Sequence, residues 1–186
     1  MGFFMKRLFF MLLAGILAIT LRPRRVHAPH AQEGEQFYPG TKIFILPGDL
    51  LFSPIGRKES RYIGHVGIVS TKKEVIHSVP AGIIKDSMQN YFHKFNKITL
   101  FSPIDQNLGQ KAARHSEKLL NDYPKAAYRI WTPLGNRDYE QYCTKIVWQS
   151  YLYGAGVNLG QLTNKAKAIH PQRLKDQRYV TRKKRF

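Results

Sequence analysis

Short apolar runs separated by turn residues fill the middle of this 186-residue sequence. The first run, residues 48–54, begins after Pro47 and ends at Pro54, which is typical of a strand between turns. Three further runs have the same length and character, at 65–70, 74–79 and 97–102. The connections among the first three runs are short, apart from a polar loop at 56–62. The pattern therefore predicts antiparallel strands in one sheet.

A helical spacing of apolar positions appears at 87–95, between the last two of these runs, and again in the second half of the chain. It predicts helices over 87–95 and 107–123, the second of them ended by Pro124. After a loop at 127–137, Asp138 is expected to cap a third helix, with Gln141 completing a capping box. That helix would cover 139–153 and end at Gly154 and Gly156. A sheet with helices beside it is an α+β fold.

Residues 1–31 are expected to be a signal peptide or a short N-terminal anchor. Lys6 and Arg7 precede an uncharged run at 8–21, which is shorter than the roughly 20 residues of a membrane-spanning helix. Cleavage is expected after Ala28 or Ala31. Arg22, Arg24 and Arg25 follow the run and weaken the usual charge asymmetry of a leader, so an uncleaved anchor remains an alternative. The protein is accordingly expected to be periplasmic or secreted.

The remaining chain is long enough for one domain, which we place at 32–160. Its 43% hydrophobic and 12% aromatic residues are typical of a folded protein. Residues 161–186 are expected to form a basic C-terminal extension. The whole chain carries a net charge of +18, and such an excess favours an anionic envelope polymer or a membrane surface as a partner. Export and the lack of a nucleic-acid-binding motif argue against nucleic acid.

The single cysteine, Cys143, lies near the start of the third predicted helix, and His65 lies on a predicted strand. A thiol near a helix N-terminus and beside an imidazole has a lowered pKa, so a reactive thiolate is expected at neutral pH. Cysteine and histidine would then form a nucleophile with its base. The alternative is a buried, inert cysteine, which is equally common for a residue of this type.

Four motifs carry a resemblance to a known family. Residues 48–52 (GDLLF), 64–69 (GHVGIV), 75–78 (VIHS) and 142–151 (YCTKIVWQSY) resemble, in this order, the permuted branch of the NlpC superfamily, the YiiX/YebB-like cysteine hydrolases. The lecithin:retinol acyltransferase group is related to this branch. The resemblance implies a circularly permuted papain-like fold, with an antiparallel sheet packed against the helix that starts near the catalytic cysteine. Permutation also accounts for a histidine that precedes the cysteine.

The resemblance implies a role for each matching residue. Cys143 would be the nucleophile, His65 the general base, and His77 the third residue, which orients the base. A histidine in the third place lacks a fixed negative charge unless another group assists it. Tyr128 matches a tyrosine that would face the substrate carbonyl, with Tyr142 as the competing candidate, and either could be a packing residue.

The expected function is therefore that of an exported cysteine hydrolase, of amidase or peptidase type, acting on cell-envelope peptide, amino-acid amide or acyl-lipid substrates through a thioacyl intermediate. No cofactor is expected. His65, His77 and Cys143 do not have the spacing of a zinc site, and His115 is expected to be an ordinary helix residue. Two alternatives stay open: a non-catalytic module that binds the envelope or anionic lipid, and a lipid acyltransferase or phospholipase.

Overall fold

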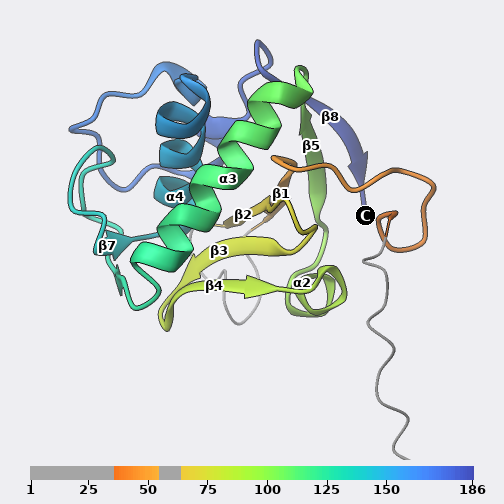
Figure 1. Ribbon diagram of the computed structural model, residues 1–186, viewed down its shortest axis with the longest axis horizontal. Coiled ribbons are helices and arrows are strands. Elements are labelled where there is room, and N and C mark those ends of the chain that lie inside the picture. The colour runs from red at the N-terminus through yellow and green to blue at the C-terminus, as the bar shows by residue number, and fades with distance from the viewer. Residues whose placement is uncertain (1–35, 55–63) are drawn as a thin grey trace, which may run out of the picture. The chain divides into compact units, whose positions relative to one another are not determined.

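The computed structural model describes residues 36–54 and 64–186 of the chain. The predicted leader and the predicted polar loop at 56–62 lie outside the described residues. The described residues form one compact unit (Figure 1). Among the described residues, no helix is long and apolar enough to cross a membrane.

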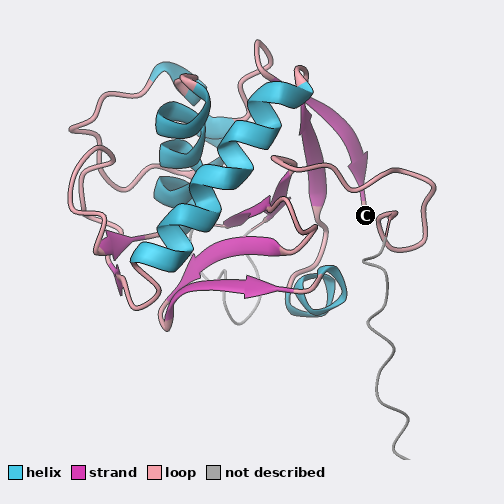
Figure 2. Cartoon of the chain, viewed as in Figure 1, coloured by secondary structure: helices cyan, strands magenta, loops and turns pink. Residues whose placement is uncertain are grey.

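A six-stranded antiparallel sheet forms the centre of this unit, with the strand order β4-β3-β2-β1-β5-β8 (Figures 1 and 2). The four predicted strands are confirmed as β1 (Leu50–Ser53), β2 (His65–Val69), β3 (Val75–Val79) and β5 (Thr99–Pro103). Two edge strands, β4 (Gly82–Asp86) and β8 (Val180–Arg185), were not predicted. All pairs in this sheet are antiparallel, as expected.

Strand β4 follows β3 through a tight turn that depends on Gly82. Its φ of +120° is a conformation that residues with a side chain rarely adopt, and a Cβ atom there would lie 2.2 Å from the backbone oxygen of Pro124. The strand itself offers only two adjacent apolar residues, Ile83 and Ile84. Two apolar residues are too weak a pattern to predict strand β4, although the Pro-Ala-Gly turn after β3 is a hairpin signal.

Strand β8 comes from the segment expected to be a basic extension, residues 161–186. Val180 is buried, and the strand pairs along β5 from Pro103↔Val180 to Thr99↔Arg185. Two short 3₁₀-helices precede it, η2 (Leu159–Gln161) and η3 (Pro171–Leu174), and Leu159 and Leu174 are both buried in the main core. This segment is thus part of the domain rather than an extension from it.

The helices lie close to where the apolar spacing places them. α2 (Met88–Lys94) is capped by Ser87, and α3 (Gln106–Asp122) is capped by Asp105. α4 (Cys143–Gln149) continues directly into a π-helical turn, η1 (Ser150–Gly154). A small parallel pair joins the start of the predicted loop, as β6 (Ala127–Tyr128), to residues expected to begin the third helix, as β7 (Glu140–Gln141). The predicted α+β fold with an antiparallel sheet is confirmed.

The sheet separates two hydrophobic cores. Because successive side chains of a strand point to opposite faces, Leu50 and Phe52 contribute to the larger core, which also contains α4, while Leu51 contributes to the smaller one. The smaller core contains Tyr91 of α2, whose hydroxyl donates to the backbone oxygen of Leu51. Helices α3 and α4 therefore cover one face of the sheet and α2 covers the other (Figure 1).

Candidate functional site

Cys143 is the first residue of α4, which is buried along its whole length. The helix packs on β2 and β3, the two strands that carry the predicted histidines. Only 4% of Cys143 is exposed. The fold thus brings the thiol to the region of the sheet that holds His65 and His77.

The predicted capping box was wrong. Residues 139–142 are not helical; the N-cap of α4 is Tyr142, whose side chain makes no capping bond. Asp138 instead accepts a hydrogen bond from Gln149 (2.8 Å), and Gln141 donates to the Gln149 side-chain oxygen (2.8 Å). The side-chain amide of Gln149 is therefore the tertiary partner of both Asp138 and Gln141. Glu140 and Gln141 are free to pair as β7, so the helix starts four residues later than expected.

His65, His77 and Asp86 form a continuous chain of hydrogen bonds. His65 Nε2 lies 2.9 Å from His77 Nδ1, and His77 Nε2 lies 2.8 Å from Asp86 Oδ2. Asp86 also forms an ion pair with Lys94 of α2, at 2.7 Å. Both imidazoles are almost completely buried. The structure therefore supplies the carboxylate that a histidine in the third place lacks.

Asp86 was missed in the sequence because its strand was missed. In the β3–β4 pairing, His77 lies opposite Ile84, so Asp86 is the diagonal neighbour of His77 two residues along β4. Diagonal neighbours of an antiparallel pair lie within reach of long or aromatic side chains. The hairpin turn after β3 was the one signal that could have pointed to it.

Aromatic rings from α2 hold the two imidazoles in place. The ring of His65 stacks on Phe95 at 4.4 Å with an interplanar angle of 4°, and His77 meets Tyr91 edge-on at 5.2 Å. Ring contacts of this kind restrict rotation about the side-chain bonds. The hydrogen-bonded chain is consequently rigid before any ligand binds.

The charge of Asp86 affects where the protons lie in the hydrogen-bonded chain of His65, His77 and Asp86. Burial raises the pKa of Asp86, but hydrogen bonds from His77 and Lys94 outweigh it and hold the pKa below its ordinary value. When His77 is the neutral tautomer that donates Nε2–H to the ionised carboxylate, its Nδ1 accepts from His65 Nε2–H. Burial, and then the positive charge of a protonated His77, lower the pKa of His65. His65 is thus neutral at physiological pH, and in the arrangement with a neutral His77 its lone pair lies on Nδ1.

The thiol of Cys143 has neighbours of its own. It interacts with the backbone N–H of Val66, which directly follows His65, and with the hydroxyl of Tyr128. Thr144 Oγ1 lies 3.9 Å from the sulfur. Among the described residues, no hydrogen bond joins His65 to Cys143. Burial raises the pKa of Cys143 despite these bonds, which is opposite to the expected direction. The resting protein therefore holds Cys143 as a neutral thiol.

The two tyrosine candidates differ in what their hydroxyls do. Tyr128 is half-buried, and its hydroxyl lies near enough to the Cys143 thiol for each group to shift the pKa of the other. Burial, and then Cys143, raise the pKa of Tyr128, so it stays a donor throughout the physiological range. The hydroxyl of Tyr142 accepts from the backbone N–H of Ile169 at 3.2 Å, and only 2% of this residue is exposed. Tyr128 is placed to meet a ligand at the sulfur, whereas Tyr142 is placed to pack.

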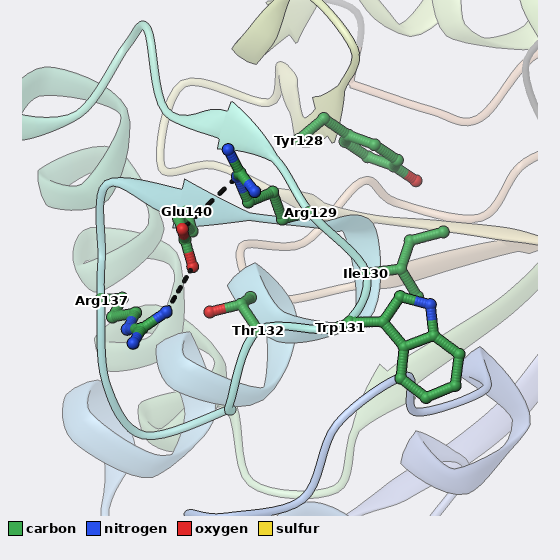
Figure 3. Close-up of a pocket in the computed structure, with 7 residues that line it drawn as sticks. All are labelled: Tyr128, Arg129, Ile130, Trp131, Thr132, Arg137 and Glu140. Carbon is green, nitrogen blue, oxygen red and sulfur yellow. Dashed lines mark ion pairs between the residues drawn. The ribbon is translucent and has the colours of Figure 1, made fainter.

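A pocket of about 390 Å³ opens beside Tyr128 (Figure 3). Ile130 and Trp131 lie next to each other along its wall, and Trp131 is 78% exposed. On the opposite wall, Glu140 lies between Arg129 and Arg137, with ion pairs to both. The pocket thus offers an apolar wall and a charged wall next to a residue that contacts the thiol.

Lys145 anchors the loop that forms this pocket. Its ammonium group is buried and donates to the backbone oxygens of Asn136, Arg137 and Glu140. Burial lowers the pKa of Lys145 to about 8. A lysine in an apolar helix gave no sequence signal for this role, because the loop it binds lies beside it only in the folded chain.

The described residues contain no group of three His, Cys, Asp or Glu side chains placed to hold a metal ion. Both ring nitrogens of His77 already have partners within the hydrogen-bonded chain. A zinc site needs three or four ligands, so the residues present do not fit one. His115 is half-buried on α3, where its ring lies 6.0 Å from that of Tyr153.

These features define an α+β domain of YiiX-like fold, in which an antiparallel sheet carries a buried histidine pair and the helix that starts at a buried cysteine packs on the same strands. One solved structure with this likeness is that of the metalloprotein yiiX from Escherichia coli O157:H7. The two share 15% sequence identity at a TM-score of 0.56, over 76% of this chain and 97% of that one. No model of a known protein family matches the sequence, and no curated protein matches it either.

Proposed function

We propose that this protein is an exported cysteine hydrolase with a permuted papain-like fold, which cleaves an amide or ester bond of a cell-envelope peptide or acyl substrate. The observation that carries the proposal is the chain from His65 through His77 to Asp86. It leaves Nδ1 of His65 as the only basic nitrogen of the pair without a partner among the described residues. The backbone N–H that follows His65 contacts the thiol.

In the proposed reaction, Nδ1 of His65 takes the Cys143 proton as the sulfur bonds to the substrate carbonyl carbon. The imidazolium that forms keeps its bond to His77, and the Asp86 carboxylate stabilises the positive charge through that ring. His65 then returns the proton to the leaving amine or alcohol as its bond to carbon breaks. Water hydrolyses the thioester by the same route, with its proton passing to His65 and then to the departing sulfur.

Tyr128 is the proposed donor to the oxygen that becomes negative in this step. Its hydroxyl interacts with the Cys143 thiol strongly enough to shift the pKa of both groups, so a carbonyl bound at the sulfur would lie within its reach. One such donor typically contributes roughly 3–4 kcal/mol to transition-state stabilisation. The apolar wall of Ile130 and Trp131 would receive the apolar part of the substrate.

A second function is favoured by the raised pKa of Cys143 and by the absence of a His65–Cys143 hydrogen bond in the described residues. The same fold would then be a non-catalytic module that binds an envelope ligand in the pocket beside Tyr128. The two functions differ in whether a covalent intermediate forms at the sulfur.

The single cysteine makes this test direct. The purified protein is incubated with p-nitrophenyl acyl esters and aminoacyl p-nitroanilides, and its intact mass is followed together with p-nitrophenol or p-nitroaniline release. A hydrolase gains the acyl mass on the peptide that contains Cys143, loses it on treatment with hydroxylamine, and shows neither adduct nor release as Cys143→Ala. Release by Cys143→Ala at the wild-type rate refutes the mechanism. Ligand binding without any adduct establishes the binding module.

A further inference from the structure

A second pocket, of about 260 Å³, lies at the other end of the sheet and is rich in positive charge. Strands β1, β5 and β8 and the short helix η3 contribute its walls. Four cationic side chains line it: Lys97, Lys175, Arg182 and Arg185. None of the four forms an ion pair with a described residue, although the chain has carboxylates elsewhere on the domain.

An irregularity in β8 places two of these cations on the same side. Arg182 pairs with Phe101 and Arg185 with Thr99, while the register shifts between Phe101 and Leu100. Residues three apart point to opposite faces of a regular strand, but one extra residue restores the alternation. Lys183 is that extra residue. Both arginines therefore border the pocket together with Thr99 and Phe101.

The third cation lies over aromatic rings. The ammonium nitrogen of Lys175 is 4.8 Å from the ring centre of Phe52 and 5.2 Å from that of Phe101. Burial, and then the nearby Arg182, lower the pKa of Lys175, and no acidic group contributes. Such a concentration of unneutralised charge stays favourable only where an anion or solvent ions offset it.

We propose that this pocket binds a phosphate group. A dianionic phosphate matches a pocket lined by several cations better than a single carboxylate does, and arginine side chains bind its oxygens in bidentate fashion. The site is independent of Cys143 and holds whether or not the thiol is catalytic. The phosphate belongs either to a soluble ester or to a lipid headgroup.

The test compares two variants that remove equal charge from the same strand. Arg182→Gln/Arg185→Gln removes the two pocket-lining arginines, and Lys183→Gln/Lys184→Gln removes two neighbouring cations that do not line the pocket. Binding of inorganic phosphate to the full chain is followed by NMR at constant ionic strength. We expect saturable shifts centred on residues 97–101 and 172–185 in the wild type.

The dissociation constant is expected to rise about tenfold or more in the arginine variant, because charge-assisted hydrogen bonds are lost, and by less than about threefold in the lysine variant. Equal weakening in both variants would mean diffuse attraction to a basic face and overturns the site. Absence of saturable binding overturns it as well. Unchanged thermal unfolding of both variants serves as the folding control, with Lys175→Gln as a further pocket variant.

Vesicles distinguish the two sources of phosphate. The protein is sedimented with phosphatidylcholine vesicles that contain phosphatidic acid, and with vesicles of phosphatidylcholine alone. Binding only to the former, lost in the arginine variant and displaced by inorganic phosphate, identifies a lipid headgroup. Phosphate binding with no sedimentation identifies a soluble phosphate ester. Vesicle binding that the arginine variant retains in full overturns the pocket as the lipid site.

Discussion

His77 Nε2 and Asp86 Oδ2 lie 2.8 Å apart, and this bond determines which nitrogen of the neighbouring His65 is basic. When a neutral His77 donates to the ionised Asp86, it accepts from His65 Nε2–H, so the lone pair of His65 lies on Nδ1. A carboxylate two rings away thereby controls the group that would accept the thiol proton. Asp86 thus joins the two histidines expected from the sequence in one hydrogen-bonded chain.

Asp86→Asn tests this control. The amide can still accept from His77, but the negative charge is gone. We expect kcat to fall roughly 10–100-fold, with little change in KM, as is typical for the loss of a supporting partner. Because Asp86 raises the pKa of His65, the acidic limb of the pH–rate profile should also move to lower pH.

Lys94→Met, which removes the half-exposed partner of the same carboxylate, is the control and should have a smaller effect. An unshifted pH profile in Asp86→Asn would leave Asp86 with a structural role only.

The two tyrosines are distinguished by paired substitutions. Tyr128→Phe removes a donor at the sulfur and should lower kcat by about 100-fold or more while leaving the unfolding free energy nearly unchanged. Tyr142→Phe removes an acceptor for Ile169 N–H, so it should reduce stability by about 1 kcal/mol with nearly full activity. Steady-state kinetics and urea unfolding on both variants measure this. The reverse outcome would make Tyr142 the residue at the reacting carbonyl.

Alkylation of Cys143 should depend on pH in a particular way. Since burial raises the pKa of Cys143 above its ordinary value, the rate with iodoacetamide should increase steadily as the pH rises from neutral into the alkaline range. The interaction with the Tyr128 hydroxyl lowers this pKa, so Tyr128→Phe should move the increase to still higher pH. Mass spectrometry of the single cysteine gives the rates. A plateau already reached near pH 6 would reveal a preformed thiolate, in disagreement with the buried, neutral thiol.

Trp131→Ala probes the pocket wall. The residue is 78% exposed, so its removal should leave the unfolding free energy within about 0.5 kcal/mol of the wild type. For substrates with an apolar acyl group, KM should rise about tenfold while kcat stays constant, because the side chain contributes binding rather than chemistry. The same substitution should have little effect on a substrate with an acetyl group. Equal kinetics on both substrates would exclude this wall from the binding site.

The pH dependence of stability should show the buried carboxyl of Asp49. Burial raises its pKa from 3.8 to about 6, although Tyr38 donates to it at 2.6 Å. A carboxyl with a raised folded-state pKa favours the folded state below pH 4, and this contribution is lost as the pH rises through 6. Asp49→Asn should therefore gain stability relative to the wild type between pH 4 and pH 7, by up to roughly 3 kcal/mol.

Urea unfolding across this pH range measures the difference. Asp122→Asn, at an exposed carboxyl near the end of α3, is the matched control and should show no such trend. A constant difference between Asp49→Asn and the wild type would mean that Asp49 titrates normally in the folded chain.

The sequence determined the elements whose apolar pattern is complete. Four strands and the helices α2 and α3 were predicted because a buried face repeats every two or every three to four residues along each of them. The order of the four motifs led to a YiiX-like fold, which the similarity to yiiX from Escherichia coli O157:H7 supports. The local sequence also placed a lone cysteine near a helix start and a histidine on each of two strands.

Only the tertiary structure decided what depends on contacts between distant segments. Asp138 carries every local feature of an N-cap, but Gln149 binds it, and the helix begins at Cys143 instead. Strand β8 is a run of cations that forms a strand because β5 offers a free edge. Asp86 reaches His77 only through the register of a hairpin, and burial reversed the expected pKa shift of the thiol. Local patterns report which face of an element is buried, whereas partners, registers and desolvation arise only when the elements pack together.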